Sequence, residues 1–104
     1  MLTDSNLTEF EINGYFRLSN VLPADLLSRL RDLFDELMDI SVPREGRFVY
    51  EYKGKQFVTN LDHICGSGNL ACLELLGFPP VLELARQICG DDFFLIQEFA
   101  VIKN

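Results

Sequence analysis

The residues whose types suit metal or nucleophilic chemistry are one histidine and three cysteines. His63 and Cys65 stand two positions apart, and Cys72 and Cys89 follow. If they converged, these four side chains could hold zinc, and His63 with Cys65 could form a nucleophilic pair. However, the sequence has no Cys-x-x-Cys knuckle, and no basic neighbour is evident that would lower the pKa of the Cys65 thiol. Cys72 and Cys89 fall in apolar helical patterns, where a free cysteine behaves as a core residue. We therefore expect His63 to be a structural or loop residue. A small protein that acts through its thiols or through zinc is the third of three alternatives, and the other two are given at the end of this section.

Gln97 and Lys103 are polar residues that interrupt an apolar strand pattern. Residues 92–104 read DFFLIQEFAVIKN, and strict alternation predicts a long strand. The face that holds both polar residues is otherwise apolar, with Phe93, Leu95, Phe99 and Val101. A polar side chain on such a face must find a partner or line a cavity. Gln97 and Lys103 are therefore candidate pocket residues, although Lys103 could instead be solvated at a frayed end.

The predicted strand over 92–104 is apolar on both faces, so it requires packing on both sides. The preceding residues offer few strands that could pair with it and little surface that could pack on both of its faces. An unpaired strand edge would promote association. We therefore expect the sequence to be the front part of a larger β-rich protein.

Composition narrows the class of protein. The chain has 104 residues, of which 48% are apolar and nine are phenylalanine, which indicates one folded domain or part of one. Nine lysine and arginine residues against 16 aspartate and glutamate residues give a net charge of −7. An acidic chain without a basic stripe cannot neutralise phosphates, so we expect no nucleic-acid partner and no anionic membrane surface.

The opening residues MLTDSNLTEF contain neither a basic segment nor an apolar run. We therefore expect no secretory signal, and no apolar stretch approaches the length of a membrane span. Three cysteines without an export signal indicate reduced thiols in a cytoplasmic protein.

Helical patterns dominate the first part of the sequence. Residues 4–13 predict a short helix that Gly14 ends, and residues 15–18 predict a short strand. Pro23 begins the clearest helix, which extends to residue 38. Its apolar stripe contains Leu26, Leu30, Leu33 and Leu37, and the stripe is wide enough to lie on a sheet.

Residues 47–53 and 55–59 predict a β-hairpin about Gly54, and residues 60–68 are expected to be irregular. Asn69 is suited to cap a short helix that Gly77 ends, with Leu70, Leu73 and Leu76 inward. Pro79-Pro80 begins another helix, which Gly90 ends, with a buried face of Val81, Leu84, Ala85 and Ile88.

The predicted order of helix, short strand, long helix, hairpin, two helices and long strand defines an α+β fold. It is not the strict β-α alternation of a doubly wound sheet, and neither a dinucleotide-binding nor a P-loop motif is present. We see no internal domain boundary.

Several segments, taken in order, resemble the phytanoyl-CoA dioxygenase family. Phe10-x-x-x-Gly14-Tyr15 followed by Phe16-x-Leu18 is similar to its opening motif, and Val21-Leu22-Pro23 with the helix to Met38 is similar to its first long helix. Leu76-Gly77-Phe78-Pro79-Pro80-Val81-Leu82 and the run from Ala85 to Gly90 resemble a later helix. The strand from Asp91 to Lys103 resembles the one that follows, although Asn104 stands where the family usually has proline.

The resemblance implies a jelly-roll or cupin-like double-stranded β-helix, of which residues 1–104 would be an incomplete N-terminal part. The complete enzyme would be an iron(II)- and 2-oxoglutarate-dependent dioxygenase that hydroxylates a small-molecule substrate. By position, Gln97 and Lys103 would then face the cosubstrate and substrate pocket.

The family holds iron with two histidines and a carboxylate, beginning with a His-x-Asp motif after the final strand of this chain. This chain has one histidine, His63, which precedes that strand and is followed by Ile64-Cys65. We therefore expect residues 1–104 alone to bind no iron or other cofactor and to be inactive. The main alternative is a stand-alone, non-catalytic remnant or interaction module. Such a module would form a homodimer or pair with a partner's strand through residues 92–104.

Overall fold

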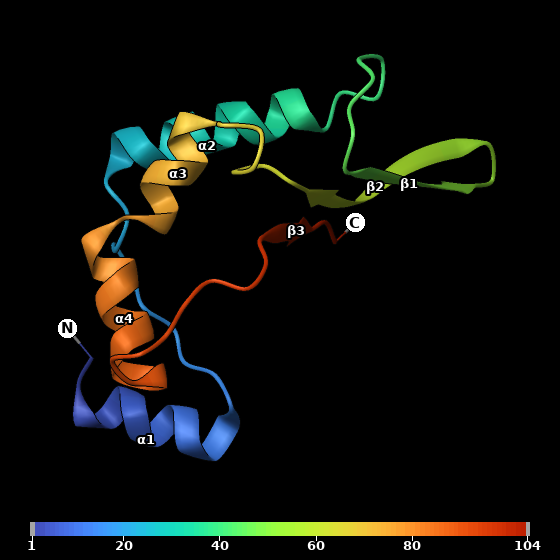
Figure 1. Cartoon of the computed structure of the whole chain (residues 1–104). Coiled ribbons are helices and arrows are strands. Elements are labelled where there is room, and N and C mark those ends of the chain that lie inside the picture. Colours follow the sequence, from blue (N-terminus) through green and yellow to red (C-terminus); the bar gives the residue numbers. More distant parts are fainter. Residues whose placement is uncertain (1, 104) are drawn as a thin grey trace.

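The computed structural model describes residues 2–103, which form an α+β fold of four helices and three strands (Figure 1). The three strands form one antiparallel sheet in the order β1-β2-β3. The elements are α1 (Asp4–Asn13), α2 (Ala24–Leu37), β1 (Arg47–Tyr52), β2 (Lys55–Asp62), α3 (Leu70–Leu76), α4 (Pro79–Cys89) and β3 (Phe99–Val101).

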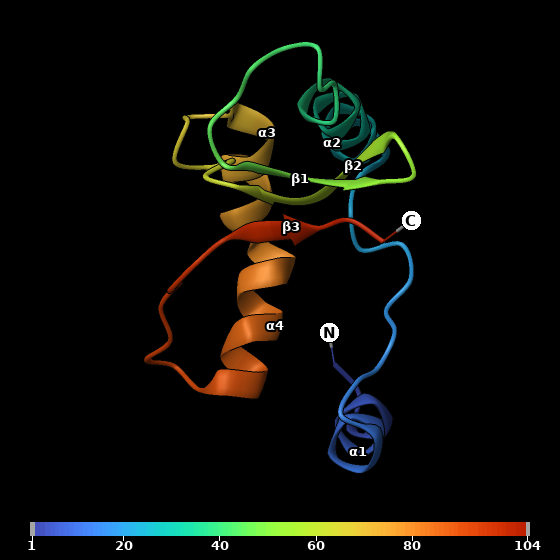
Figure 2. The same cartoon turned by 90° about the vertical axis from the view of Figure 1, so that its right-hand side faces the viewer.

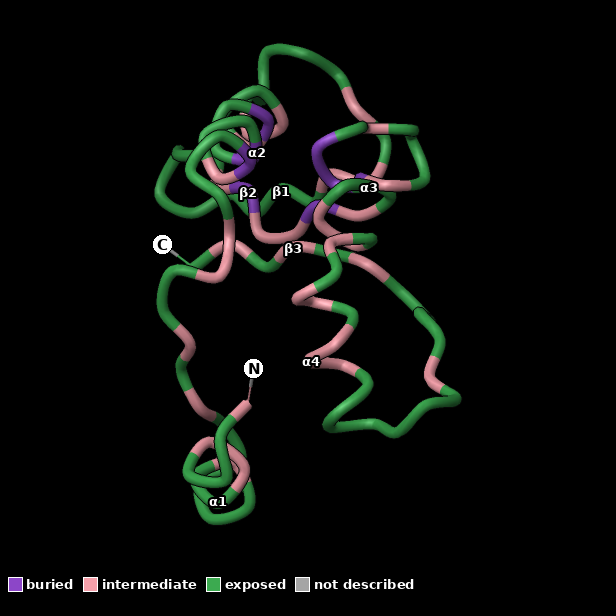
Figure 3. The backbone as a smooth tube through the Cα atoms, turned by 90° about the vertical axis from the view of Figure 1, so that its left-hand side faces the viewer, coloured by how far each residue is buried: buried purple, intermediate pink, exposed green. Residues whose placement is uncertain are grey.

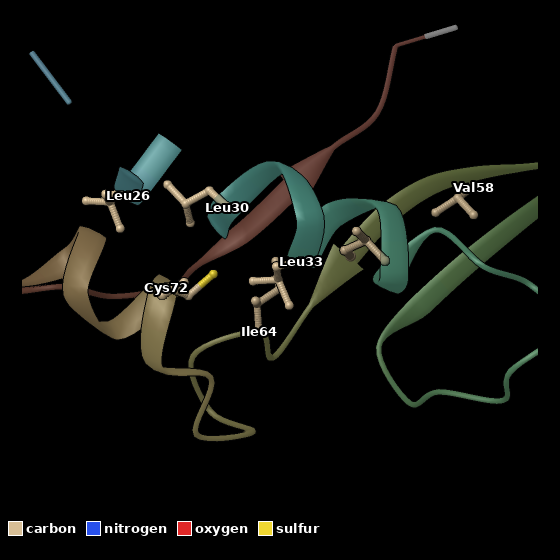
Figure 4. Close-up of a cluster of buried hydrophobic side chains, with 8 residues drawn as sticks. Leu26, Leu30, Leu33, Val58, Ile64 and Cys72 are labelled. Carbon is tan, nitrogen blue, oxygen red and sulfur yellow. The ribbon is translucent and has the colours of Figure 1, made fainter. Parts of the chain in front are cut away.

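The core lies where α2 crosses one face of the sheet. Leu26, Leu30 and Leu33 recur along one side of α2 and are buried, as their spacing predicts. They form one cluster with side chains from β2, the loop after it and α3 (Figure 4), namely Val58, Leu61, Ile64, Ala71 and Cys72. Figure 3 shows that the buried positions gather in this region and that α1 and α4 contribute none. The described residues therefore have one small core.

A β-bulge determines which residues of β2 enter this core. Val58 and Leu61 are both buried, although residues three positions apart lie on opposite faces of a regular strand. The pairing of β1 with β2 shifts by one residue in mid-hairpin, which leaves Thr59 opposite no residue of β1. This extra residue returns Val58 and Leu61 to the same face. The Thr59 hydroxyl donates a hydrogen bond of 3.2 Å to the Phe48 carbonyl at the irregularity.

Most helix and hairpin predictions are confirmed. Thr3 caps α1 by accepting from the Asn6 backbone amide, and Asn69 caps α3 by accepting from the Cys72 amide. The hairpin turns at Gly54 as expected. However, β2 extends to Asp62, so the expectation that the irregular segment begins at residue 60 is wrong by three residues.

The prediction of one strand over 92–104 is wrong in its length, because β3 covers only Phe99–Val101. Phe99 pairs with Asp62, the last residue of β2. At the next position, His63 adopts a left-handed conformation and leads the chain away from the sheet. Residues 93–98 therefore have no neighbouring strand to pair with. Asn104 lies outside the described residues.

The predicted short strand over residues 15–18 is also absent from the described structure. This segment connects α1 to α2 and pairs with neither edge of the sheet. Its apolar character is explained in part by packing on α1, because the Phe16 ring meets the Phe10 ring edge-on at a centroid distance of 5.9 Å.

The inward face of α3 differs from the prediction. Ala71 and Cys72 are buried, whereas Leu70 and Leu73 are exposed. The residues of this two-turn helix are apolar on nearly all sides, so its periodicity does not select one face. Packing against α2 selects it instead, and a salt bridge of 2.7 Å joins Arg29 of α2 to Glu74 of α3.

Helix α4 leads away from the sheet, and α1 lies near its far end (Figures 1 and 2). The predicted inner residues Val81, Leu84 and Ala85 are half-buried, and Ile88 is exposed, so a fully buried face on α4 is wrong. Cys89 is exposed too, which corrects the expectation that it is a core residue. These differences arise because α4 has no sheet face beneath it.

Within residues 2–103, none of the helices combines the length and the apolar character needed to cross a membrane.

The core assignment leads to a direct stability test with two leucines. Leu61 is 0% exposed and Leu70 is 78% exposed. Leu61→Ala is expected to lower the free energy of unfolding by about 2–5 kcal/mol because it leaves a cavity. Leu70→Ala is expected to change it by less than about 0.5 kcal/mol. Urea unfolding followed by circular dichroism measures both, and equal losses would contradict this core.

Candidate functional site

The face of the sheet opposite α2 is the candidate site. Alternation places Ala100 and Ile102 of the β3 segment against the core, so Phe99 and Val101 lie on the opposite face. No other element of residues 2–103 covers this face, where several large apolar side chains are exposed: Phe48, Tyr50, Tyr52, Phe99 and Val101. The Tyr50 and Tyr52 rings stack along it with a centroid distance of 6.4 Å. The open face therefore combines a paired strand backbone with aromatic surface.

A hollow of about 470 Å³ lies on this open face. Its walls come from all three strands and from the segment before β3: Phe48, Thr59, Asn60, Asp62, Gln97 and Phe99. The hollow is open to solvent, and its lining of aromatic rings with a few polar groups is a combination that small-molecule sites share. Among the described residues, this hollow is the one that combines aromatic rings with a carboxylate and two amides.

The two predicted pocket residues lie in different places. Gln97 lines the hollow beside Phe99, on the face that alternation predicts. Lys103 is exposed, lies two residues beyond the end of β3 and does not line the hollow. A role for either residue in binding cosubstrate or substrate stays a prediction.

Sequence reasoning missed Asn60 and Asp62 as members of the site. Both were assigned to an irregular segment, but they are the last two outward-facing residues of β2. The alternation of Asn60, Leu61 and Asp62 was the available signal. The bulge at Thr59 obscured it, because it breaks the two-residue period immediately before Asn60.

Hydrogen bonds hold the backbone of Asp62, and its carboxylate forms no ion pair with any residue of 2–103. The Asp62 amide donates to the Gly46 carbonyl at 2.7 Å, and the Asp62 carbonyl accepts from the Arg44 guanidinium at 3.1 Å. Arg44 also donates to the Glu45 carbonyl at 2.9 Å. Among the residues that the structure describes, no lysine or arginine forms a salt bridge with the Asp62 side chain. The open face therefore presents a carboxylate on a backbone that hydrogen bonds hold in place.

The cysteines and the histidine form no shared site. Cys65 and Cys72 line a separate cavity of about 130 Å³, while His63 and Cys89 are exposed. The backbone amide of Cys65 donates to the Glu98 carboxylate at 3.2 Å. Within residues 2–103, no three side chains from histidine, cysteine, aspartate and glutamate gather to hold a metal ion.

The pKa of both inner thiols is raised. Burial raises the pKa of Cys65, and the charge of Glu98 raises it further. Burial also raises the pKa of Cys72 to about 11, with a further contribution from Cys65. Because the thiolate is the reactive form, the Cys65–His63 pairing considered from the sequence lacks an activated thiol.

Comparisons with protein-family models, with curated proteins and with solved structures found no match for this chain. The interpretation of the site therefore rests on the geometry of the sheet and on the chemistry of its open face.

Two glycines allow a test of how the site is held. Gly46 and Gly54 both have a positive φ, of 77° and 73°. A side chain at Gly54 would meet nothing within 4 Å, whereas a Cβ at Gly46 would lie 2.6 Å from the Asp62 carbonyl oxygen. We expect Gly46→Ala to destabilise the fold by about 1 kcal/mol or more beyond the cost of Gly54→Ala, since only Gly46 adds a backbone clash to the shared strain. Thermal and urea unfolding measure the difference, and equal costs would contradict the close approach.

Thiol labelling tests the cysteine environments. At pH 8, Cys89 is expected to react with iodoacetamide well before Cys72, because Cys89 is exposed and Cys72 is buried with a pKa of about 11. The rate at Cys72 should rise about tenfold per pH unit below that pKa, as its thiolate fraction grows. Peptide mass spectrometry follows each site, and labelling in urea provides the control, in which the three rates should converge. Faster labelling of Cys72 in the folded protein would contradict this arrangement.

Proposed function

We propose that residues 1–104 are the N-terminal part of an iron(II)- and 2-oxoglutarate-dependent oxygenase domain similar to the phytanoyl-CoA dioxygenase family. In this proposal the sheet of β1, β2 and β3 belongs to one wall of a jelly roll. Helix α2 covers the outside of the wall, and the open face with its hollow is turned toward the interior. The complete enzyme would act on a small-molecule substrate.

The observation that carries the proposal is the asymmetry of the sheet. The leucine stripe of α2 covers the part of one face that holds Val58 and Leu61, while the other face exposes aromatic rings around a hollow with polar walls. Jelly rolls and related barrels place ligands between sheets, on faces that the remaining strands enclose. A sheet that already has one covered face and one ligand-like face fits the outer and inner sides of such a wall.

Exposed apolar residues outside the sheet also favour a larger domain. Ile12 and Tyr15 are exposed at the end of α1 and just after it, and Phe94 and Ile96 are 80% and 87% exposed. Monomeric proteins rarely expose large contiguous apolar patches unless another surface covers them. In the proposed domain, further strands would pair with residues 93–98 and cover these side chains.

The residues present do not fit an iron site of the family type. That site needs two histidines and a carboxylate, but this chain has only His63, which is exposed on a loop after β2. The proposal therefore assigns no metal ligand and no catalytic step to residues 1–104. Their proposed contribution is to support the wall and shape the pocket, with Gln97 in the hollow and Lys103 beyond β3.

A second candidate function is an interaction module without catalytic activity. The strand order β1-β2-β3 leaves the outer edge of β3 unpaired within residues 2–103. Unpaired strand edges are common sites for strand addition by a second copy or by another protein. The short length of β3, only three residues, limits how much pairing this edge offers.

The decisive test is to read the coding sequence beyond the codon for Asn104. If the frame continues, the longer protein and the 104-residue chain are both assayed for oxygenase activity. The oxygenase proposal expects the same frame to continue through a His-x-Asp motif, a later histidine and an arginine. The longer product should decarboxylate 2-oxoglutarate with iron(II), while the 104-residue chain should not.

The contrary result is equally clear. A stop codon directly after Asn104, or activity in the 104-residue chain, would overturn the proposal. In the first case the interaction module would be favoured if analytical ultracentrifugation gave a stable dimer that Val101→Pro abolishes. The Ile102 amide donates to the Thr59 carbonyl of β2, so the amide of the neighbouring Val101 faces the outer edge, where a second strand would add. Pro is incompatible with a hydrogen-bonded amide in a strand.

A further inference from the structure

We propose that the hollow on the open face binds a small molecule through a cationic amine. As a statement about the substrate of an oxygenase, this rests on the proposed function. As a statement about binding, it rests only on residues of the hollow. Neither the exposed apolar surfaces nor the cysteine cavity offers a comparable combination of charge and rings.

The strand pairing places one carboxylate between two aromatic rings. Asp62 and Phe99 are directly opposite each other on β2 and β3, and Phe48 is directly opposite Asn60 on the other side of β2. Opposite residues in an antiparallel pair lie close together on the same face, and diagonal neighbours are within reach of aromatic side chains. Asp62 therefore has Phe99 beside it and Phe48 at a diagonal position.

These groups complement an ammonium ion in three ways. The Asp62 carboxylate supplies the opposite charge. The faces of Phe48 and Phe99 attract a cation through their ring quadrupoles. The side-chain amides of Asn60 and Gln97 line the same hollow, and their oxygens are suited to accept hydrogen bonds from ammonium N–H groups.

Charge argues against an anionic ligand at this position. Asp62 carries no salt bridge among residues 2–103, and the chain as a whole has a net charge of −7. The nearest guanidinium, that of Arg44, binds the carbonyls of Glu45 and Asp62 and does not line the hollow. Lys55 and Lys103 share this face by alternation, but neither lines the hollow. A phosphate or carboxylate group beside Asp62 would therefore meet repulsion without a cation in the lining.

The small extent of the hollow favours a small molecule as the occupant. A volume of about 470 Å³ accommodates an amine with an attached ring or short chain, and it lies in the range of small-molecule sites. The exposed rings of Tyr50 and Tyr52 extend along the same face but do not line the hollow.

The experiment is an NMR titration of the ¹⁵N-labelled 104-residue chain with phenethylamine. We expect saturable shifts at the amides of Asn60, Asp62, Gln97 and Phe99. The neutral analogue 2-phenylethanol should bind at least about tenfold more weakly, and phenylacetate should bind more weakly still. Equal affinity for the neutral analogue, shifts that map elsewhere, or no saturation by about 50 mM phenethylamine would overturn the proposal.

Matched variants separate the charge of Asp62 from its structural role. Asp62→Asn should weaken phenethylamine binding about tenfold, whereas Asp62→Glu should retain most of it because the charge remains. Glu51→Gln is the control, since Glu51 is an exposed carboxylate of β1 on the opposite face of the sheet. The spectrum of each free variant reports whether it is folded. Equal binding by Asp62→Asn and the unmodified chain would contradict the inference.

The binding test and the oxygenase test fail independently. Amine binding by a chain whose longer product lacks oxygenase activity would retain this inference and remove the proposed function. If the longer product is an active oxygenase but the hollow does not bind phenethylamine, the proposed function is retained and this inference is removed.

Discussion

One extra residue in β2 determines which of its side chains face the core and which face the open side of the sheet. In a regular strand, Asn60 and Asp62 would share a face with Val58, beneath the leucines of α2. Burying an unpaired carboxylate there would be costly, and Leu61 would face outward instead. The bulge at Thr59 reverses the alternation after Val58, so both apolar residues reach the core and both polar residues reach the open face. The core and the candidate site therefore depend on the same irregularity.

The end of β2 extends this dependence to the rest of the fold. His63 turns the chain away from the sheet in a left-handed conformation, and the next residue, Ile64, enters the core between α2 and α3. The same turn makes Asp62 the last residue of the central strand. Phe99 is consequently the first residue of the final segment that can pair, and residues 93–98 remain outside the sheet. The position of one turn thus determines the packing of α3 and the length of β3 together.

The sequence was informative wherever local interactions determine structure. The α2 stripe, the Asn69 cap and the turn at Gly54 act over a few residues, so composition and spacing predict them. The bulge could not be predicted, because its position depends on which neighbours α2 buries. The face of α3 and the length of β3 likewise depend on partners distant in sequence. The candidate site was predicted only in part: alternation identified Gln97, whereas Asp62 required knowledge of the register.

The chain exposes apolar side chains in the segment before β3 and on the open face of the sheet. These two surfaces differ in the kind of molecule that could cover them. Around Phe94 and Ile96 the exposed side chains form an apolar run, and the carboxylate of the nearby Glu98 is turned to the Cys65 amide. Such a surface suits packing against protein. The hollow instead places the Asp62 carboxylate among aromatic rings and two amides on a backbone held by hydrogen bonds. A fixed charge among apolar rings supplies orientation as well as contact, which is the property that distinguishes a ligand site from an interface. The two surfaces are therefore assigned different partners, protein for the segment before β3 and a small cationic molecule for the open face of the sheet.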